Sequence, residues 1–284
     1  MDIFLENISS IHPLNTPFEK KALNRISIHI PSGQFVAIMG AVGSGKTTLI
    51  QTMCGLLPPL SGDIKIGSYR LNKKANRNRV WKEVGYLSQF PEHQVMEDTV
   101  FNHVAEGLNH LGLTRERLTE RVKEILEAVG LCSNRFKDLS PFQVSGGELR
   151  RVALAGILAA EPKILILDEP TAGLDGLERL RILSLLKQIH IENKITILYI
   201  SHRLEEALEY SERIVVVDHG QIVEDFHPSE IRTRFRNLEK IGFVKTPMLR
   251  LMDLLEKRLS RNMPRYIYKE EQLVSYLTKL TGRD

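Results

Sequence analysis

The sequence predicts an α/β fold with a parallel β-sheet at its centre. Three short apolar runs, 35–39, 164–167 and 195–200, each end at glycine or polar residues. Runs of this length with polar ends are typical of strands buried on both faces, as in parallel sheets. Apolar residues at helical spacing lie between them. Because ligands of such sheets bind at the carboxyl ends of the strands, the residues directly after the three runs form the candidate site.

The first run leads into a glycine-rich segment that opens an expected helix. Its residues are Gly40-Ala41-Val42-Gly43-Ser44-Gly45-Lys46-Thr47-Thr48. This spacing is the P-loop pattern, in which glycines let backbone N–H groups surround phosphate oxygens and the helix N-terminus adds positive potential. Lys46 is expected to reach the terminal phosphates, and Thr47 is expected to ligate Mg²⁺.

The other two runs are followed by further polar residues. Asp168-Glu169 ends the second run, and His202 follows the third. Ser145-Gly146-Gly147-Glu148 precedes a helical pattern over residues 149–160, which places its glycines at a helix N-terminus. Such a terminus is a second candidate anion site.

Together these motifs resemble those of the ATP-binding cassette (ABC) family, over roughly residues 3–225. GAVGSGKTT matches Walker A, VSGGE the signature, ILILDE Walker B, and Ser201-His202 the switch. Four segments are similar to energy-coupling factor (ECF) transporter ATPases: Thr16-Pro17-Phe18-Glu19, Phe90-Pro91-Glu92-His93-Gln94, Arg150-Arg151-Val152-Ala153-Leu154-Ala155-Gly156 and Pro170-Thr171-Ala172-Gly173-Leu174-Asp175. Of the two ATPase types that pair in that group, this chain resembles the second. Its departures from the usual motifs, Val144, Glu148 and Gly176, remove neither a phosphate ligand nor the base.

The resemblance implies a P-loop NTPase fold of the ABC nucleotide-binding type. Residues 3–225 would form this domain, with a RecA-like parallel sheet, an antiparallel β subdomain and an α-helical subdomain at about 90–160. The residues agree, since 3–37 are rich in strand patterns. One apolar helical face contains Leu118, Val122, Ile125, Leu126 and Val129.

Residues 226–284 would form a C-terminal helical extension. Two apolar faces are expected there: Met248, Leu251, Met252, Leu255 and Leu259, then Leu273, Leu277 and Leu280. They could pack within the chain, or they could serve dimerisation, the use to which ECF ATPases put such an extension. The resemblance favours dimerisation.

The resemblance also assigns roles in ATP hydrolysis. Glu169 would be the general base, and Asp168, Thr47 and Gln89 would hold Mg²⁺ or its water. His202 would hold the γ-phosphate. Adenine would stack on His12, where the family usually has an aromatic residue, or on nearby Phe18.

Two anion sites in one chain exceed the needs of one triphosphate. The economical explanation is a head-to-tail dimer, in which Walker A of one subunit and Ser145-Gly146-Gly147-Glu148 of the other hold each nucleotide. Asp175 would lie at that interface.

Composition sets outer limits on the function. A chain of 284 residues with 42% hydrophobic content can form one large domain or two smaller ones. No apolar run approaches the ~20 residues of a membrane span, and the N-terminus is unlike a signal peptide, so we expect a cytoplasmic protein. Cys54 and Cys132 lack metal-type spacing, which favours buried or incidental thiols.

The net charge of +4 is uneven along the sequence, because residues 228–284 contain thirteen Lys or Arg against seven Asp or Glu. Such a tail could meet nucleic acid, anionic lipid or an acidic partner, or it could form a solvated helical face.

The function that the resemblance favours is the ATPase of an ECF importer for vitamins or other micronutrients. It would lie on the cytoplasmic face of the membrane, with a second ATPase, a transmembrane scaffold and a substrate-capture component as partners and no nucleic acid. The loop at 90–94 would couple ATP to the scaffold. Alternatives are a homodimeric cobalt or nickel importer ATPase and a soluble ABC ATPase acting on ribosomes or DNA. The transported substrate is not encoded in this chain.

Overall fold

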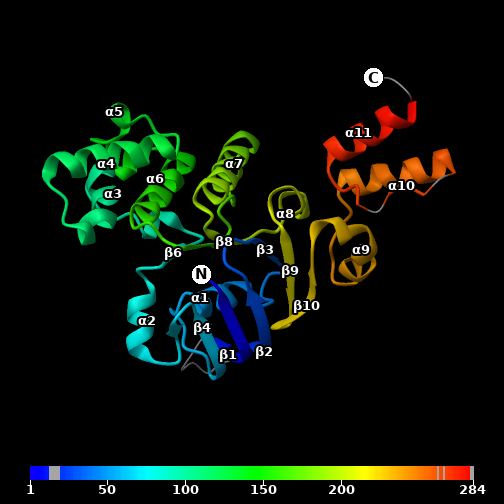
Figure 1. The fold of residues 1–284 in the computed structure, drawn as a ribbon, viewed down its shortest axis with the longest axis horizontal. Helices are drawn as coiled ribbons and strands as arrows, with labels where there is room; N and C mark the ends of the chain where they lie inside the picture. Colours follow the sequence, from blue (N-terminus) through cyan, green and yellow to red (C-terminus); the bar gives the residue numbers. More distant parts are fainter. Residues whose placement is uncertain (13–19, 261, 265, 282–284) are drawn as a thin grey trace.

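The computed structural model describes residues 1–12, 20–260, 262–264 and 266–281, which form two β-sheets surrounded by helices (Figure 1). The first sheet contains, in order, β2 (Lys20–Ile30), β1 (Ile3–His12), β4 (Ser61–Ile66) and β5 (Tyr69–Arg70). The second contains β10 (Gln221–Phe226), β9 (Arg213–Asp218), β3 (Phe35–Met39), β8 (Thr196–Ile200), β7 (Ile164–Leu167) and β6 (Val84–Leu87).

The helices cover the second sheet and continue beyond it. They are α1 (Lys46–Met53), α2 (Lys74–Val80), α3 (Val100–Leu108), α4 (Arg115–Ala128), α5 (Ser133–Phe136), α6 (Gly146–Ala159), α7 (Gly176–Asn193), α8 (Leu204–Tyr210), α9 (Ile231–Lys240), α10 (Pro247–Leu259) and α11 (Glu270–Thr281). Short 3₁₀ turns lie at Pro91–His93, Asn109–Leu111, Pro141–Gln143 and Pro228–Glu230.

All three predicted strands lie in the six-stranded sheet, as β3, β7 and β8. The neighbouring strands from β9 to β6 pair in parallel, and β10 is antiparallel at one edge. Every residue of β3, β7 and β8 is buried. The prediction of a parallel sheet with strands covered on both faces is therefore confirmed, although β8 begins at Thr196, one residue after the apolar run begins.

Alternate residues of these strands enter two different hydrophobic cores. Phe35, Ala37 and Met39 belong to the core beneath α3, α4, α6 and α7, whereas Val36 and Ile38 belong to the core shared with α1 and the antiparallel sheet. This alternation follows from the two-residue period of a strand. Since packed side chains close both faces of the sheet, the strand ends are the places where ligands can approach.

The predicted amphipathic helix at 118–129 is confirmed as α4. It buries Val122, Ile125 and Leu126 in the core that also contains residues of α3 and α6. An added Cβ on Gly107 of α3 would lie 2.5 Å from the Gly156 carbonyl oxygen of α6. Glycine at 107 therefore permits the close approach of these two helices.

The last strand ends at Phe226, and the chain beyond it is helical (Figure 1). Met252, Met263, Ile267 and Leu273 form a small separate core there. The two apolar faces expected from the sequence are only partly used within the chain. Three of their leucines are at least 40% exposed, namely Leu251, Leu259 and Leu280.

Four of the ten described cations of this C-terminal region are held in ion pairs, namely Arg232, Arg234, Lys245 and Lys269. Arg232 meets Glu256 at 2.6 Å, and Lys245 meets Asp253 at 2.5 Å. Lys269 meets Glu209 of α8 at 3.1 Å. Of these three pairs, Lys269–Glu209 offsets part of the charge excess of residues 228–284, because Glu209 lies outside that range. In the described part of the chain, no helix combines the length and apolarity that crossing a bilayer requires.

Candidate functional site

The glycine-rich loop joins β3 to α1 in a conformation that requires glycine at two positions. Gly40 has φ 146° and Gly45 has φ 107°, both outside the usual range of L-residues. An added Cβ on Gly40 would lie 2.1 Å from the Val217 carbonyl oxygen, and one on Gly45 would lie 2.4 Å from the Ala22 carbonyl oxygen. The loop is therefore clamped between β9 and β2, which fixes the start of α1 at Lys46.

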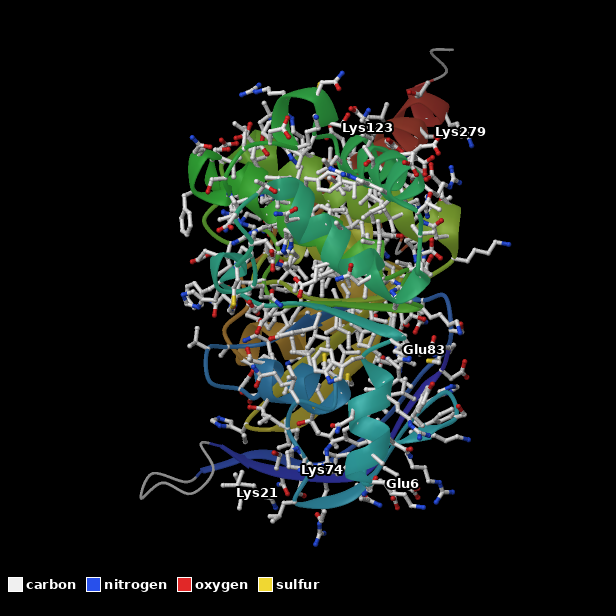
Figure 2. The ribbon with its side chains drawn as sticks, turned by 90° about the vertical axis from the view of Figure 1, so that its left-hand side faces the viewer. Glu6, Lys21, Lys74, Glu83, Lys123 and Lys279 are labelled. Atoms are coloured by element: carbon white, nitrogen blue, oxygen red, sulfur yellow. The ribbon has the colours of Figure 1, made fainter. Side chains whose placement is uncertain are left out.

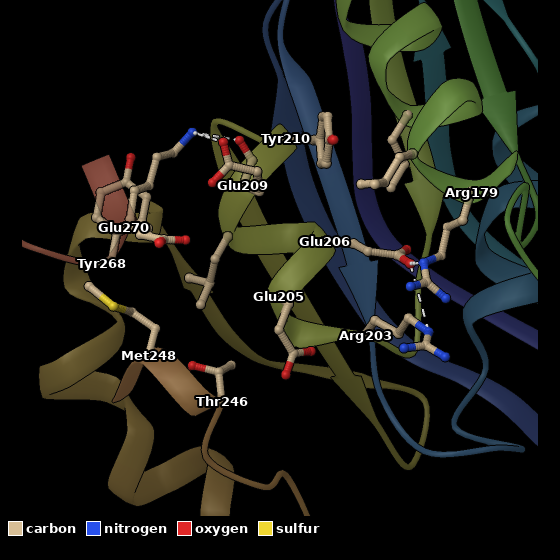
Figure 3. A pocket seen from close by; sticks show the side chains of 14 residues that line it. Arg179, Arg203, Glu205, Glu206, Glu209, Tyr210, Thr246, Met248, Tyr268 and Glu270 are labelled. Atoms are coloured by element: carbon tan, nitrogen blue, oxygen red, sulfur yellow. Dashed lines mark hydrogen bonds and ion pairs between the residues drawn. The ribbon is translucent and has the colours of Figure 1, made fainter. Parts of the chain in front are cut away.

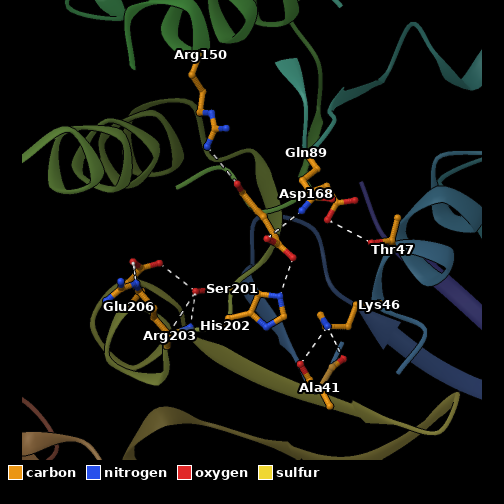
Figure 4. A network of polar contacts seen from close by, with 12 residues as sticks. Ala41, Lys46, Thr47, Gln89, Arg150, Asp168, Ser201, His202, Arg203 and Glu206 are labelled. Carbon is orange, nitrogen blue, oxygen red and sulfur yellow. Dashed lines mark hydrogen bonds and ion pairs between the residues drawn. The ribbon is translucent and has the colours of Figure 1, made fainter. Parts of the chain in front are cut away.

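The Lys46 ammonium lies inside this loop. Its Nζ donates hydrogen bonds to the carbonyl oxygens of Gly40 at 3.0 Å and Ala41 at 2.8 Å (Figure 4). Burial lowers the pKa of Lys46, an effect that the negative charges of Glu169 and Asp168 oppose. A phosphate in the loop would supply the anionic partner that this buried cation favours.

A second feature of the loop also suits a phosphate. The Ser44 hydroxyl oxygen is buried and has no hydrogen-bond partner among the described residues. Buried hydroxyls are normally satisfied, so an unpaired one next to a glycine-rich loop is consistent with a ligand oxygen. The backbone at the start of α1 also has unpaired N–H groups that can surround an anion.

Two neighbouring carboxylates follow β7, which β8 separates from β3 in the sheet. Asp168 is 2% exposed and accepts a hydrogen bond from the Thr47 hydroxyl at 3.5 Å. Burial raises the pKa of Asp168, and the charge of Glu169 raises it further, whereas Thr47 and Lys46 lower it. A divalent cation here would favour the ionised form of Asp168.

Glu169 contacts both Gln89 and His202, the two other residues predicted to act in hydrolysis. Its Oε1 lies 2.7 Å from His202 Nε2, and its Oε2 accepts a hydrogen bond from Gln89 Nε2 at 3.4 Å (Figure 4). Glu169 has φ 51°, a left-handed conformation that is uncommon for a non-glycine residue. The ends of β6, β7 and β8 thus bring Gln89, Glu169 and His202 together, and such strain is often found at functional sites.

The expected Mg²⁺ ligands, Thr47, Asp168 and Gln89, also lie around this strand end. In the residues that the structure describes, no group of three or more His, Cys, Asp or Glu could hold a metal ion by itself. That composition fits Mg²⁺, which usually takes one or two carboxylates from the protein and further oxygens from water and phosphate.

Arg150 supports the segment after Glu169, a role that sequence reasoning missed. Its Nη1 donates to the carbonyl oxygens of Glu169 at 3.3 Å, Pro170 at 2.8 Å and Ala172 at 2.9 Å. The guanidinium therefore braces this turn from α6, the helix that begins with the signature. Only its place in the Arg150–Gly156 segment singled it out in the sequence.

Glu206 is a second residue that sequence reasoning missed. Its carboxylate, 7% exposed, accepts hydrogen bonds from the hydroxyls of Ser201 at 3.0 Å and Thr171 at 3.1 Å. It also pairs with Arg179 of α7 at 3.2 Å (Figure 3). These three partners belong to the segment before His202, the segment after Glu169, and the helix after Asp175. Glu206 thus connects them from behind the site.

The signature begins α6, as predicted. Ser145 caps the helix by accepting from the Glu148 backbone N–H at 3.3 Å, and the Glu148 carboxylate accepts from the Ser145 N–H at 2.8 Å. The glycine-rich loop leads into α1 and the signature into α6, and within the described residues no hydrogen bond or ion pair joins Gly146 or Gly147 to that loop. The two candidate anion sites of one chain are therefore separate.

Asp175 occupies a comparable position at the start of α7. Its carboxylate accepts from the backbone N–H groups of Leu177 and Glu178, both at 2.9 Å. Glu178 in turn pairs with Arg151 of α6 at 3.0 Å. The start of α7, which Asp175 caps, and the signature helix α6 are thereby held to each other.

The loop after Gln89 is fixed at its base and exposed at its tip. Gln94 accepts from the Ser88 backbone N–H at 2.8 Å and donates to the Tyr86 carbonyl oxygen at 3.0 Å. Phe90 is 53% exposed and Met96 is 83% exposed. An apolar surface therefore lies next to a residue that contacts Glu169.

The adenine-stacking predictions fall mainly outside the described structure. His12 ends β1, but its side chain is not among the described ones, and Phe18 lies in the segment 13–19. A cavity beside Lys46 is lined by Lys21 and Ala22 of β2 and by the His219-Gly220 turn. His219, which sequence reasoning missed, is a further candidate for contact with a bound ligand there.

A further cavity lies away from this site, between α7, α8 and the C-terminal helices (Figure 3). Arg179, Glu206, Thr246 and Tyr268 are among its lining residues. The predicted nucleotide and metal residues are absent from its lining. Of the cysteines, Cys54 is buried, which raises its pKa, and Cys132 is exposed.

Comparison with known proteins gives a consistent family. A family model described as ABC transporter matches residues 23–172. The energy-coupling factor transporter ATP-binding protein EcfA2 of Clostridium perfringens is 44% identical over 243 residues, covering 85% of each chain. EcfA2 of Clostridium tetani is 39% identical, covering 99% of this chain and 97% of the relative.

Solved structures agree with these relatives. CbiO1 from Clostridium perfringens, described as part of the ABC transporter complex CbiONQ, superposes with a TM-score of 0.74 and 29% identity, covering 88% of this chain and 98% of that chain. A dimeric ATP-binding cassette, MJ0796, bound to ADP and Pi, gives a TM-score of 0.73 and 27% identity, covering 80% and 98%.

Proposed function

The chain belongs to the ABC transporter family, as an ATP-binding subunit of the energy-coupling factor type, and from this premise we propose how its site works and what it serves. Its activity is ATP hydrolysis coupled to import. The proposal concerns the roles of individual residues, the metal, the partners and the solute.

In this proposal, ATP lies on the glycine-rich loop. Backbone N–H groups of residues 40–48 and the Lys46 ammonium bind the phosphates, and Thr47, Asp168 and Gln89 hold Mg²⁺. A bound Mg²⁺ would neutralise charge that develops on the phosphate oxygens. His12 or Phe18 stacks on the adenine.

The observation that carries the hydrolysis proposal is the contact of Glu169 with both His202 and Gln89. Glu169 accepts the proton of the attacking water, because its carboxylate lies at the strand end beside the phosphate loop. His202 orients Glu169 and contacts the γ-phosphate. Gln89 contacts Glu169 and directly precedes the loop at 90–94, so a change at the nucleotide site moves this loop.

The catalytic unit in this proposal is a dimer with a second ECF ATPase. Ser145, Gly146, Gly147 and Glu148 contact the nucleotide held by the partner, and Asp175 lies at the interface. The separation of the two anion sites within one chain supports this arrangement. Residues 3–225 form the nucleotide-binding domain, and 226–284 form an extension that contributes to dimerisation.

The transport partners follow from the exposed apolar loop and from the relatives. Phe90, which directly follows Gln89, and Met96 are exposed, as a surface for a transmembrane scaffold would be. With a substrate-capture component, the complex imports a vitamin or another micronutrient. The subunit then works at the cytoplasmic face of the membrane, without nucleic acid. The EcfA2 relatives, at 44% and 39% identity, favour the paired ATPase over a homodimeric metal importer.

The test is purification of the tagged chain from gently solubilised native membranes, with identification of copurifying proteins by mass spectrometry. We expect a second cassette ATPase and integral membrane proteins, including one that captures the solute. Membrane proteins without a second ATPase would indicate the homodimeric alternative. Ribosomal or DNA-bound proteins alone would contradict the transport proposal.

A further inference from the structure

The surface around α2 carries a concentration of positive charge that the ATPase site does not use. From residue 64 to residue 82 the sequence has seven Lys or Arg and no Asp or Glu: Lys65, Arg70, Lys73, Lys74, Arg77, Arg79 and Lys82. Over the whole chain the two classes nearly balance, at 39 against 35. This segment is therefore the most one-sided charge distribution in the protein.

Six of these cations are exposed and free of carboxylate partners. Arg77 differs, because its guanidinium donates to the carbonyl oxygens of Leu71 at 2.8 Å and Asn72 at 3.3 Å. Within the described ranges, the other six form no ion pair, and the flanking Glu83 is already bound to Lys163 at 2.9 Å. These six residues are called the α2 surface below: Lys65, Arg70, Lys73, Lys74, Arg79 and Lys82.

The C-terminal tail, with the other concentration of cations, behaves differently. Arg232, Arg234 and Lys245 each have a carboxylate within 3.5 Å. With Lys269, four of the ten described cations of the tail are paired, whereas none of the six cations of the α2 surface is. A partner that meets six unpaired cations is expected to be anionic.

The place of α2 in the fold indicates which anionic partner. Residues 81–83 connect α2 to β6, the edge strand of the six-stranded sheet, and the other end of β6 leads to the exposed Phe90 and Met96. The C-terminal extension follows β10, the opposite edge strand. In Figure 1, α2 and β6 lie on the left and α9 to α11 on the right.

Figure 2 views the molecule from the β6 side and shows α2, with Lys74 labelled, below α4, with Lys123 labelled. If Phe90 and Met96 meet a transmembrane scaffold, as the proposed function requires, this side of the molecule faces the bilayer. The pairs Arg117–Glu120 and Arg121–Glu124 neutralise much of the charge on α4. The α2 surface is thus the main unneutralised charge on the side toward the membrane.

Trp81 adds an independent indication. It is the single tryptophan of the chain, follows α2 directly, and is 40% exposed. Tryptophan side chains are enriched at membrane–water interfaces, where an apolar ring and a polar N–H are both accommodated. Binding of nucleic acid would also use these cations. It would not explain why they lie close to the loop at 90–94, which is proposed to contact the transmembrane scaffold.

We propose that the α2 surface binds the anionic phospholipid headgroups of the membrane that carries the transporter, an inference that rests on the proposed function. Lysine and arginine near an anionic leaflet each add to the attraction, which decays within about one Debye length, roughly 10 Å at 0.1 M salt. The contact orients the subunit beneath its scaffold and leaves ATP chemistry untouched.

The test measures binding of the full-length chain to vesicles of pure phosphatidylcholine and to vesicles containing about 30% phosphatidylglycerol, in roughly 0.1 M salt. Trp81 emission provides a local readout, because no other tryptophan contributes. We expect a blue shift and cosedimentation with the anionic vesicles alone, both lost in roughly 1 M salt. Failure of the unmodified chain to bind anionic vesicles would overturn the proposal.

Matched variants localise the contact. Lys73→Gln, Lys74→Gln, Arg79→Gln and Lys82→Gln together remove four charges from the α2 surface. The control set, Lys240→Gln, Lys257→Gln, Arg258→Gln and Lys279→Gln, removes the same residue types from exposed positions in the C-terminal helices. We expect affinity for anionic vesicles to fall at least about tenfold in the first variant and to change less than about twofold in the second. Equal losses would mean non-specific attraction and would contradict the proposal.

Two further outcomes separate this proposal from its alternatives. Tighter binding of the unmodified chain to duplex DNA or RNA than to anionic vesicles, lost in the same α2 variant, would assign the surface to nucleic acid. The vesicles contain no protein partner, so the vesicle test and the copurification test are independent. If the chain copurifies with membrane proteins but does not bind anionic vesicles, the lipid inference is wrong and the transport proposal stands. If the chain binds anionic vesicles but copurifies with no membrane proteins, the transport proposal is contradicted instead.

Discussion

The carboxyl edge of the parallel sheet and the C-terminal extension handle charge in opposite ways. At the sheet edge, Lys46 and Asp168 are almost completely buried and lie close to Glu169, and burial shifts their pKa values against the charged forms. In the extension, Arg232 and Glu256 lie near the surface in a direct ion pair, and the Arg232 hydrogen bond lowers the pKa of Glu256. The buried charges at the sheet edge lower the stability of the folded protein and serve the binding of a ligand. The ion pair in the extension raises the stability of the folded protein.

The comparison teaches where substitutions act. Changes at the sheet edge are expected to alter turnover or nucleotide binding, whereas changes in the extension are expected to alter unfolding. Four variants test this division.

The largest effect is expected for Glu169→Gln. The amide keeps the size and the contact with Gln89 but cannot accept a proton, so turnover falls about 10²–10³-fold while ATP affinity stays within about threefold. Phosphate release and equilibrium nucleotide binding measure the two quantities in the assembled ATPase pair. Turnover within a few-fold of the parent would remove Glu169 from the role of base. Glu116→Gln, an exposed position on α4, is the control.

Lys46→Ala is expected to act on binding itself. The variant loses a charge-assisted hydrogen bond to phosphate, which corresponds to roughly 10- to 100-fold weaker nucleotide affinity. Titration with a fluorescent ATP analogue measures this change. Unaltered affinity would show that the backbone of the loop binds the nucleotide without Lys46. The predicted difference between Lys46→Ala, which weakens binding, and Glu169→Gln, which does not, would then be absent.

Glu206→Gln sharpens the division, because this residue supports the site without lying in it. The amide leaves Arg179 without its buried carboxylate, so the segments before His202 and after Glu169 lose a shared partner. We expect kcat to fall about fivefold with KM nearly unchanged. The neighbouring exposed residue provides a matched control, Glu205→Gln. A rise in KM with constant kcat would contradict a positioning role.

The smallest effect on chemistry is expected for Arg232→Ala. The substitution removes the ion pair with Glu256 at 2.6 Å and the hydrogen bond to the Met263 carbonyl oxygen at 2.8 Å. We expect the free energy of unfolding to fall by about 2 kcal/mol and Tm to fall by about 5 °C. Turnover stays within about twofold. Lys257→Ala, an exposed neighbour on α10, should leave Tm within about 1 °C.

The Arg232 effect also has a pH dependence. Because the pKa of Glu256 is lowered in the folded protein, the stability from the pair is present above the ordinary pKa of glutamate, about 4.3. It is lost as pH falls through the lowered folded pKa. Thermal melts of the parent and Arg232→Ala should therefore converge at acidic pH, and a constant difference would contradict the ion pair as its cause.

The sequence predicts the sheet well for a physical reason. β3, β7 and β8 are buried on both faces, so they must be apolar throughout, and the loop before Lys46 needs glycines that no other residue replaces. Both constraints leave a pattern that can be read locally. The roles given to Glu169, His202 and the signature remain predictions, which the contacts in the structure support.

Residues that act through distant partners were not predictable in this way. Arg150 binds backbone carbonyls, which have no sequence signature, and Glu206 joins three segments that only the fold brings together. The charge count of the tail also left its ion pairs open, since a count cannot distinguish paired from unpaired cations. Lys245 and Asp253 illustrate this, because they neutralise each other at 2.5 Å.

The strand order has a consequence for synthesis of the chain. β3 carries the phosphate loop, yet its two neighbours are β8 and β9, which are made much later. At about 5–20 residues per second, roughly 10–35 s pass between emergence of β3 and emergence of β9. During that interval both edges of an entirely apolar strand lack their native partners. The nascent subunit is thus most exposed to aggregation on the ribosome, before its last third is translated.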